Sequence, residues 1–260
     1  MKALFAVLLL LFAGFVPAAQ WKESAAVDAL FAEAGLAGTF VLYDEQADTL
    51  TGHDRTRAET RYLPASTFKV ANSLIGLSSG AVRSIDEVLP YGGKPQPIAA
   101  WEHDMGLREA IRISNVPIYQ ELARRIGLER MRGAVRQLGY GNGEIGEVVD
   151  NFWLAGPLKI SAVEQATFLA SLAQERLPFP RQAQRDVATI IELETGANWS
   201  LHGKTGWATR STPAIGWWVG WVRKEGRIYS FALNIDMPRE ALASRRVELG
   251  RDCLKALGVL

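Results

Sequence analysis

Ser66-Thr67-Phe68-Lys69 is the only place in the chain where a lysine follows a serine by three residues, and it comes just after Pro64, where a helix is predicted to begin. Residues three apart share a helix face, so the Lys69 amine is expected beside the Ser66 hydroxyl. A serine hydroxyl needs an adjacent base to act as a nucleophile at neutral pH, and this spacing predicts both groups on one turn. An ordinary solvated serine and lysine give the same pattern, so the interpretation depends on other motifs.

Two motifs further along the chain support the first. Ser114-Asn115-Val116 lies between two predicted helices and is followed by Pro117, which fixes the turn. Lys204-Thr205-Gly206 lies at the end of a predicted strand, directly before Trp207. The order Ser-x-x-Lys, Ser-x-x, Lys-Thr-Gly is the arrangement of penicillin-interacting serine enzymes. The three motifs together predict a nucleophilic serine site rather than a solvated helix face.

Each side chain of these motifs has an expected task. On this interpretation, Ser66 attacks the lactam carbonyl and Ser114 relays a proton to the leaving nitrogen. Lys204 provides a positive field, and the Thr205 hydroxyl donates to the carboxylate that penicillins carry. Gly206 leaves the strand edge clear, so that the substrate can lie along it. All of these tasks are predictions from the order and chemistry of the motifs.

The main chain and one tryptophan add two further expectations. The backbone N–H groups of Ser66 and Trp207 are predicted to form an oxyanion hole, a contribution of about 3 kcal/mol per donor in comparable enzymes. Trp101 is a candidate wall of the active-site cleft, and an ordinary packed aromatic is an equally good interpretation of it.

The motifs and their surroundings resemble the class D serine β-lactamases, the oxacillinases, over nearly all of the mature chain. Val116 stands where class A enzymes and penicillin-binding proteins place an asparagine. Tyr140-Gly141-Asn142 matches a class D element, and Phe152-Trp153-Leu154 with Leu158-Lys159-Ile160-Ser161 is similar to the family's tryptophan loop. The segment Gly216 to Trp221 is similar to the strand after the Lys-Thr-Gly motif. The resemblance implies an α+β fold of the serine β-lactamase and penicillin-binding transpeptidase type, with an antiparallel sheet flanked by N- and C-terminal helices and a helical lobe.

The resemblance also implies a modified lysine. An apolar pocket lowers the pKa of a lysine and makes its neutral amine available. In class D enzymes that amine reacts with carbon dioxide, and the resulting carbamate serves as the general base. By resemblance Lys69 would carry this carbamate, with Phe68, Val116, Trp153 and Leu154 as its apolar surround. The Trp153 indole N–H would donate a hydrogen bond to it. No other cofactor is implied.

An arginine before the last helix is the final residue that the resemblance assigns. In the family it pairs with the substrate carboxylate, for which a bidentate guanidinium is well suited. Arg245 is the predicted anchor, and Arg246 is an alternative one residue away. A solvated arginine at a helix start is the other interpretation of Arg245.

The hydrophobic pattern predicts one domain over residues 20–260. A helix over 25–34 and a strand over 39–43 come first, and turns with a second strand are expected within 44–61. A helical lobe is predicted over about 64–196, with helices at 68–77, 105–113, 118–126, 128–138 and 161–174. Strands at 199–205, 215–222 and 228–235 and a helix over 244–257 complete the chain, and residues 223–227 form a hairpin connection.

Composition narrows the possible partners and the compartment. The net charge of +1 gives no electrostatic reason to expect nucleic acid as a partner. Lys2 and the apolar residues 4–16 predict a signal peptide over residues 1–19, hence a periplasmic protein with no membrane contact after cleavage; an uncleaved anchor is the alternative. Cys253 is the only cysteine, so no intrachain disulfide is possible. His53, His103 and His202 lack zinc-ligand spacing, and no metal site is predicted.

Two other functions remain as alternatives, and one property stays open. A penicillin-binding transpeptidase would be acylated and deacylate slowly, and Val116 and Trp153 argue against it. A β-lactam sensor domain that stays acylated is the non-enzymatic alternative. Family membership implies penicillins as substrates, whereas carbapenem hydrolysis depends on the shape of the loop from Arg210 to Ala214. The chain is expected to be a monomer or a homodimer.

Overall fold

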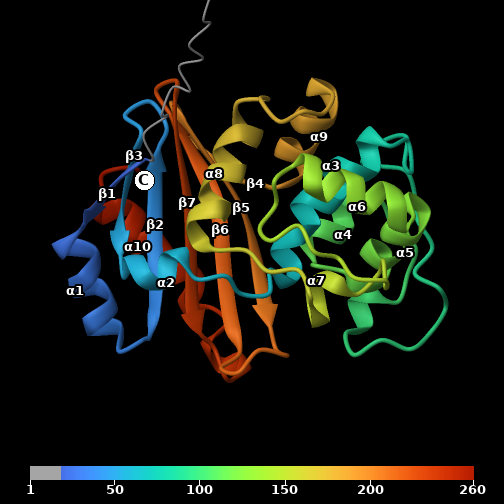
Figure 1. The fold of residues 1–260 in the computed structure, drawn as a ribbon, viewed down its shortest axis with the longest axis horizontal. Helices are drawn as coiled ribbons and strands as arrows, with labels where there is room; N and C mark the ends of the chain where they lie inside the picture. The colour runs from blue at the N-terminus through green and yellow to red at the C-terminus, as the bar shows by residue number, and fades with distance from the viewer. Residues whose placement is uncertain (1–18) are drawn as a thin grey trace, which may run out of the picture.

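The computed structural model describes residues 19–260, and a mixed seven-stranded sheet is its main feature (Figure 1). Residues 1–18 of the predicted signal peptide lie outside the described residues. The sheet has the order β1-β3-β2-β7-β6-β5-β4, and β1 and β3 are parallel whereas the other neighbours are antiparallel. The strands are β1 (Gln20–Glu23), β2 (Gly38–Asp44), β3 (Thr49–His53), β4 (Glu192–Thr195), β5 (Trp199–Ala208), β6 (Ile215–Lys224) and β7 (Arg227–Asp236).

Helices cover both faces of the sheet and form a lobe beside it (Figure 1). Their bounds are α1 (Ala25–Ala34), α2 (Arg55–Glu59), α3 (Lys69–Ser78), α4 (Leu107–Arg112), α5 (Val116–Ile126), α6 (Leu128–Gln137), α7 (Phe152–Ala155), α8 (Ala162–Ala173), α9 (Arg181–Ile190) and α10 (Arg245–Ala256). A short 3-10 helix, Ala65–Phe68, leads directly into α3. Among residues 19–260, none of the helices combines the length and the apolar character that a bilayer crossing requires.

The long strand β6 shows why the sheet is buried on both faces. Trp217 and Trp221 pack into the core shared with the helical lobe, whereas Trp218 and Val222 pack into the core under α1 and α10. Because successive side chains of a strand point to opposite faces, one run of apolar residues fills both cores. The predicted α+β fold is confirmed, and three central strands extend their predicted ranges by one to three residues.

The predicted helical lobe is not a uniform insert. Helix α8 begins at a Ser161–Glu164 capping box and packs on β7, β2 and β6, so it belongs to the sheet layers. Strand β4 lies inside the predicted lobe and pairs with β5 at the sheet edge. Helix α9 and strand β1 were not predicted from the sequence. Helix α9 is clearly amphipathic, with Ala183, Val187 and Ile190 on its buried face, so its periodicity was a signal that could have found it, whereas β1 is only four mostly exposed residues. The lobe proper contains α3 to α7 and α9 (Figure 1).

Candidate active site

Ser66 and Lys69 meet at the junction of the 3-10 helix and α3. The Lys69 Nζ donates to the Ser66 Oγ at 2.7 Å. The preceding residue, Ala65, has a φ of +48°, which lets the chain turn sharply from Pro64 into the helix. Ser66 is half-buried and Lys69 is fully buried, so the serine keeps some exposure to solvent whereas the lysine is enclosed. The structure therefore brings together the two groups that the first motif predicted to be neighbours.

The pocket around the Lys69 amine is aromatic and dry. The Phe68 ring stacks on Trp153 with centroids 5.5 Å apart, and the Lys69 Nζ lies 5.4 Å from the centroid of Tyr119. Burial, and then the charge of Lys204, hold the pKa of Lys69 well below its ordinary value. The Trp153 Nε1 is buried and has no hydrogen-bond partner among the described residues. A buried donor without a hydrogen-bond partner costs free energy of folding, so the Trp153 indole N–H is suited to an acceptor bound in this pocket.

Ser114 reaches the site from the loop between α4 and α5. It has a φ of +58°, an uncommon conformation for a serine. The next residue, Asn115, caps α5 by accepting from the Ile118 backbone N–H at 3.0 Å, and its amide donates to the Trp101 carbonyl at 3.3 Å. These two contacts of Asn115 hold the neighbouring Ser114 in its strained conformation. The Lys204 Nζ donates to the Ser114 hydroxyl at 3.1 Å.

Strand β5 lies directly against the helix that carries the serine. A Cβ on Gly206 would lie 3.0 Å from the Pro64 carbonyl oxygen and 3.1 Å from the Thr67 Cγ2, so this position needs glycine for the close approach. The Trp217 indole donates to the Leu63 carbonyl at 2.9 Å and fixes the same junction from the neighbouring strand. Gly206 therefore allows β5 to pack closely against this helix, and the edge that it was expected to leave clear for a substrate stays a prediction.

Lys204 and Arg246 form a cationic edge beside this strand. The Arg246 guanidinium donates to the Gly206 carbonyl at 2.8 Å. Burial and the charge of Arg246 lower the pKa of Lys204 to about 7. A cavity of about 410 Å³ opens next to Lys204 and the half-buried Thr205, and Glu192 and Leu193 at the start of β4 also line it. Two cations without a carboxylate partner among residues 19–260 make this edge suitable for an anionic group.

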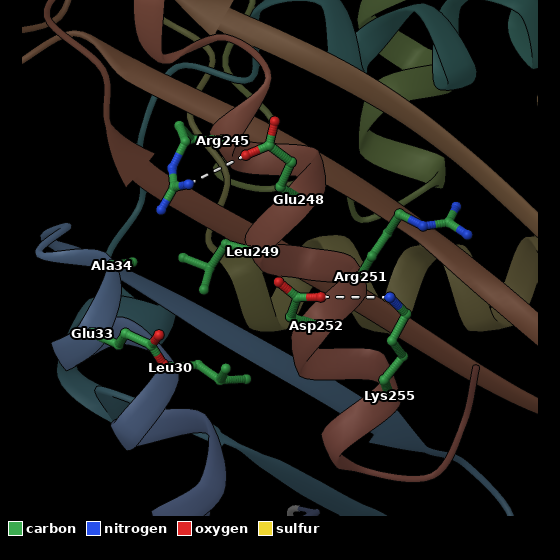
Figure 2. A pocket seen from close by; sticks show the side chains of 9 residues that line it. All are labelled: Leu30, Glu33, Ala34, Arg245, Glu248, Leu249, Arg251, Asp252 and Lys255. Atoms are coloured by element: carbon green, nitrogen blue, oxygen red, sulfur yellow. Dashed lines mark hydrogen bonds and ion pairs between the residues drawn. The ribbon is translucent and has the colours of Figure 1, made fainter.

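The structure does not place Arg245 at the site. Figure 2 shows Arg245 directed toward Glu248, and the two side chains form an ion pair at 3.3 Å. Its side chain is 45% exposed and lines a separate groove between α1 and α10, with Leu30 among its neighbours. Adjacent residues of a helix point about 100° apart, so only one of the two arginines can face β5. The structure therefore places Arg246, and not the predicted Arg245, beside β5.

The remaining predicted residues belong to segments next to the three motifs. Val116, Leu154 and Trp101 are half-buried, and the Trp101 indole donates to the Ile113 carbonyl at 3.1 Å. The Trp207 indole donates to the Met237 carbonyl at 3.0 Å, and the side chain packs against the core under α1 and α10.

Sequence reasoning missed a buried polar pair behind Lys69. The Tyr119 hydroxyl and the Ser73 hydroxyl lie 2.7 Å apart, and Ser73 donates to the Lys69 carbonyl at 2.8 Å. Burial raises the pKa of Tyr119 above its ordinary value, so the hydroxyl stays neutral. Its position three residues after Val116 on one helix face was a signal that could have found it. Within residues 19–260 no group of three or more His, Cys, Asp or Glu side chains is arranged to hold a metal ion.

Comparison with known proteins agrees with this geometry. The family described as "Penicillin binding protein transpeptidase domain" matches residues 38–254. The chain is 38% identical to β-lactamase OXA-5 of Pseudomonas aeruginosa, with 100% of this chain and 99% of that protein covered. It is 39% identical to β-lactamase OXA-48 of Klebsiella pneumoniae, covering 92% and 90%. The crystal structure of the class D β-lactamase FUS-1 (OXA-85) of Fusobacterium nucleatum superposes with a TM-score of 0.89 at 44% identity, covering 92% of this chain and all of that one.

Proposed function

Because the chain belongs to the class D serine β-lactamases, we propose that it hydrolyses penicillin-type β-lactams through an acyl-enzyme on Ser66. The observation that carries the proposal is the 2.7 Å contact between the Ser66 hydroxyl and a Lys69 amine whose pKa is depressed by burial. A neutral amine accepts a proton, which is what activation of a serine requires.

In the acylation step the Ser66 Oγ bonds to the lactam carbonyl carbon and its proton passes to the base at Lys69. The backbone N–H groups of Ser66 and Trp207 stabilise the negative charge that develops on the carbonyl oxygen. When the carbon–nitrogen bond breaks, Ser114 gives its proton to the lactam nitrogen and is reprotonated from Lys204, which lies 3.1 Å away. The proton taken up at Lys69 then passes through solvent to Lys204, which restores both groups. In the second step a water molecule attacks the ester carbonyl carbon and gives a proton to the base at Lys69, which passes that proton to the Ser66 oxygen as the carbon–oxygen bond breaks.

The Lys69 pocket fits a carbamate made from carbon dioxide. Burial holds the pKa of its amine well below the ordinary value, and the buried Trp153 Nε1 lacks an acceptor among the described residues. When bound, the carbamate would supply an anionic general base. Trp153 would hold it by donating from the indole, and Phe68, Val116 and Leu154 would keep water away. Acid protonates the amine and removes the group, so activity lost at mildly low pH should return with added bicarbonate; indifference to bicarbonate would contradict this part of the proposal.

The substrate carboxylate is assigned to the cationic edge of β5. The Thr205 hydroxyl and the Arg246 guanidinium donate to the carboxylate, and Lys204 lies alongside as a second positive charge. The buried position of this edge is what gives the interaction its strength, because charge-assisted hydrogen bonds weaken in water.

We also propose that the protein is exported to the periplasm and acts there without a membrane contact, as a monomer or a homodimer. The supporting observation is the charged, apolar and small-residue order of the first 19 residues. Sequencing the N-terminus of protein taken from a periplasmic extract tests the cleavage, and light scattering on the same material tests the oligomeric state.

Turnover of a chromogenic cephalosporin, together with intact mass after brief exposure to benzylpenicillin, tests the proposed function. We expect many turnovers, a transient mass increase of one drug, and neither in Ser66→Ala. A persistent adduct without turnover would instead indicate a transpeptidase or a sensor domain. An adduct that survives in Ser66→Ala and is lost in Ser78→Ala would move the nucleophile to the Gly-x-Ser-x-Gly sequence of residues 76–80, at the end of α3.

A further inference from the structure

A second cavity lies between the tryptophan loop and the loop that joins β5 to β6. It has a volume of about 770 Å³, and its wall includes Leu63, Ala155 and Arg210. Each of these continues a segment of the active site: Leu63 is three residues before Ser66, Ala155 follows Leu154, and Arg210 is three residues after Trp207. The cavity is therefore built from the same three chain segments as the site, and neither Lys204 nor Arg246 of the cationic edge lines it.

The direction of a bound penicillin along β5 leads to this cavity. On the proposed function, the carboxylate lies at Thr205 and the lactam carbonyl at the Trp207 N–H. The line from one to the other runs along the strand toward its end at Ala208. Arg210 lies at most about 10 Å of chain beyond Trp207. The acylamino side chain, attached next to the carbonyl, is thus directed into the cavity.

The cavity carries an excess of positive charge. Arg61, Lys159 and Arg210 line it together with one carboxylate, Glu144. Arg61 forms a close ion pair with Glu164 and is neutralised by it. Lys159 and Arg210 form no ion pair within residues 19–260, so their charges are available to a ligand.

The main chain under Lys159 is held rigidly. The Asn142 side chain accepts from the Lys159 backbone N–H at 3.0 Å and donates to the Pro157 carbonyl at 3.0 Å. A Cβ on Gly141 would lie 2.0 Å from the Lys159 carbonyl oxygen, so this contact exists because residue 141 is glycine. The lysine therefore stands at a fixed place on the rim rather than on a freely moving loop.

We propose that Lys159 and Arg210 form a side-chain subsite that favours β-lactams with a negatively charged acylamino substituent. The inference rests on the proposed function and adds a charge preference to it. Carbenicillin, benzylpenicillin and ampicillin share one skeleton and carry at the same carbon a carboxylate, a hydrogen and an ammonium group. All three drugs share the carboxylate that would bind the cationic edge, so the contribution of that carboxylate cancels when their kcat/KM values are compared.

The test is the ratio of kcat/KM for carbenicillin to kcat/KM for ampicillin, with benzylpenicillin as the neutral reference. Each of Lys159→Gln and Arg210→Gln should lower the ratio by roughly two- to fivefold, as exposed charge pairs do, and the double variant by the product of the two effects. Arg245→Gln, which removes an arginine from the α1–α10 groove, is the matched control and should leave the ratio unchanged. A double variant whose ratio stays within the error of the parent protein would overturn the proposal.

Salt gives a measurement that needs no variant. The Debye length falls from about 10 Å at 0.1 M salt to about 3 Å at 1 M, so the ratio for the unaltered protein should fall as salt is added. A ratio that does not respond to salt would also contradict the subsite. Failure of benzylpenicillin turnover in the unaltered protein would instead contradict the proposed function, so the two failures are distinguishable.

Discussion

Lys69 and Lys204 are both buried lysines without a carboxylate partner among the described residues, yet their surroundings differ. Lys69 lies under the tryptophan loop among Phe68, Tyr119 and Trp153, closed off from the cleft by Ser66. Lys204 lies at a strand edge beside Arg246 and a cavity. Burial is the largest cause of the lowered pKa in both. The difference is one of access: apolar and aromatic side chains enclose the Lys69 amine, whereas the Lys204 amine borders a cavity that an anion could enter, and a bound anion would raise its pKa again.

Lys69→Met separates catalysis from stability in the closed pocket. Methionine fills the space of the lysine stem without an amine, so kcat/KM for penicillins should fall by about a thousandfold or more. Stability should stay equal or rise, because a buried polar group no longer has to be desolvated. Urea unfolding and nitrocefin turnover measure the two effects. Retained activity in a folded variant would show that Lys69 is not the base.

Arg246→Ala tests the open edge. Removing a charge-assisted contact to the substrate carboxylate should raise KM for penicillins by about tenfold to a hundredfold, which corresponds to 1.5–3 kcal/mol. The neighbouring variant, Arg245→Ala, is the matched control, since its side chain pairs with Glu248 instead. Equal effects of the two substitutions, or a larger effect at Arg245, would return the anchor to the residue that sequence alone suggested.

Trp153→Phe asks whether the unpartnered indole has an acceptor during catalysis. The ring keeps its packing against Phe68 but loses the N–H, so kcat should fall by about ten- to a hundredfold and depend more strongly on bicarbonate. Trp221→Phe, a tryptophan stacked on His202 elsewhere in the sheet, controls for the loss of buried area. If both substitutions change kcat and its bicarbonate dependence equally, the indole N–H has no special part.

Stability should depend on pH through the open-edge lysine. An unfolded lysine keeps its proton to about pH 10.4, whereas folded Lys204 loses it near a pKa of about 7. Between these values the unfolded chain binds more protons, so the free energy of unfolding should rise with pH by up to about 1.4 kcal/mol per unit. Urea titrations at pH 7.5 and 9.5 should show a smaller rise for Lys204→Met. An unchanged slope would mean that Lys204 is not titrating in this window.

Sequence periodicity and motif spacing predicted the parts of the molecule that depend on near neighbours. Ser66 and Lys69 meet because three residues along a helix return to the same face, and the strands around Trp217 were recognisable from their apolar runs. Gly206 was expected to leave the strand edge clear for a substrate, and the structure shows that it allows β5 to approach Pro64 and Thr67 closely.

Only the tertiary structure shows which of Arg245 and Arg246 faces β5, and which groups lie behind Lys69. The rotation of a helix about its axis is fixed only when one of its faces packs against the rest of the protein. In α10 the buried face carries Leu249, Cys253 and Leu254. With this face against the sheet, Arg246 points toward Gly206 and Arg245 toward solvent. The Tyr119 and Ser73 hydroxyls meet across two helices whose pairing no local pattern specifies. The sequence determines which residues share a face of one helix or strand, whereas contacts between elements depend on how their buried faces pack together.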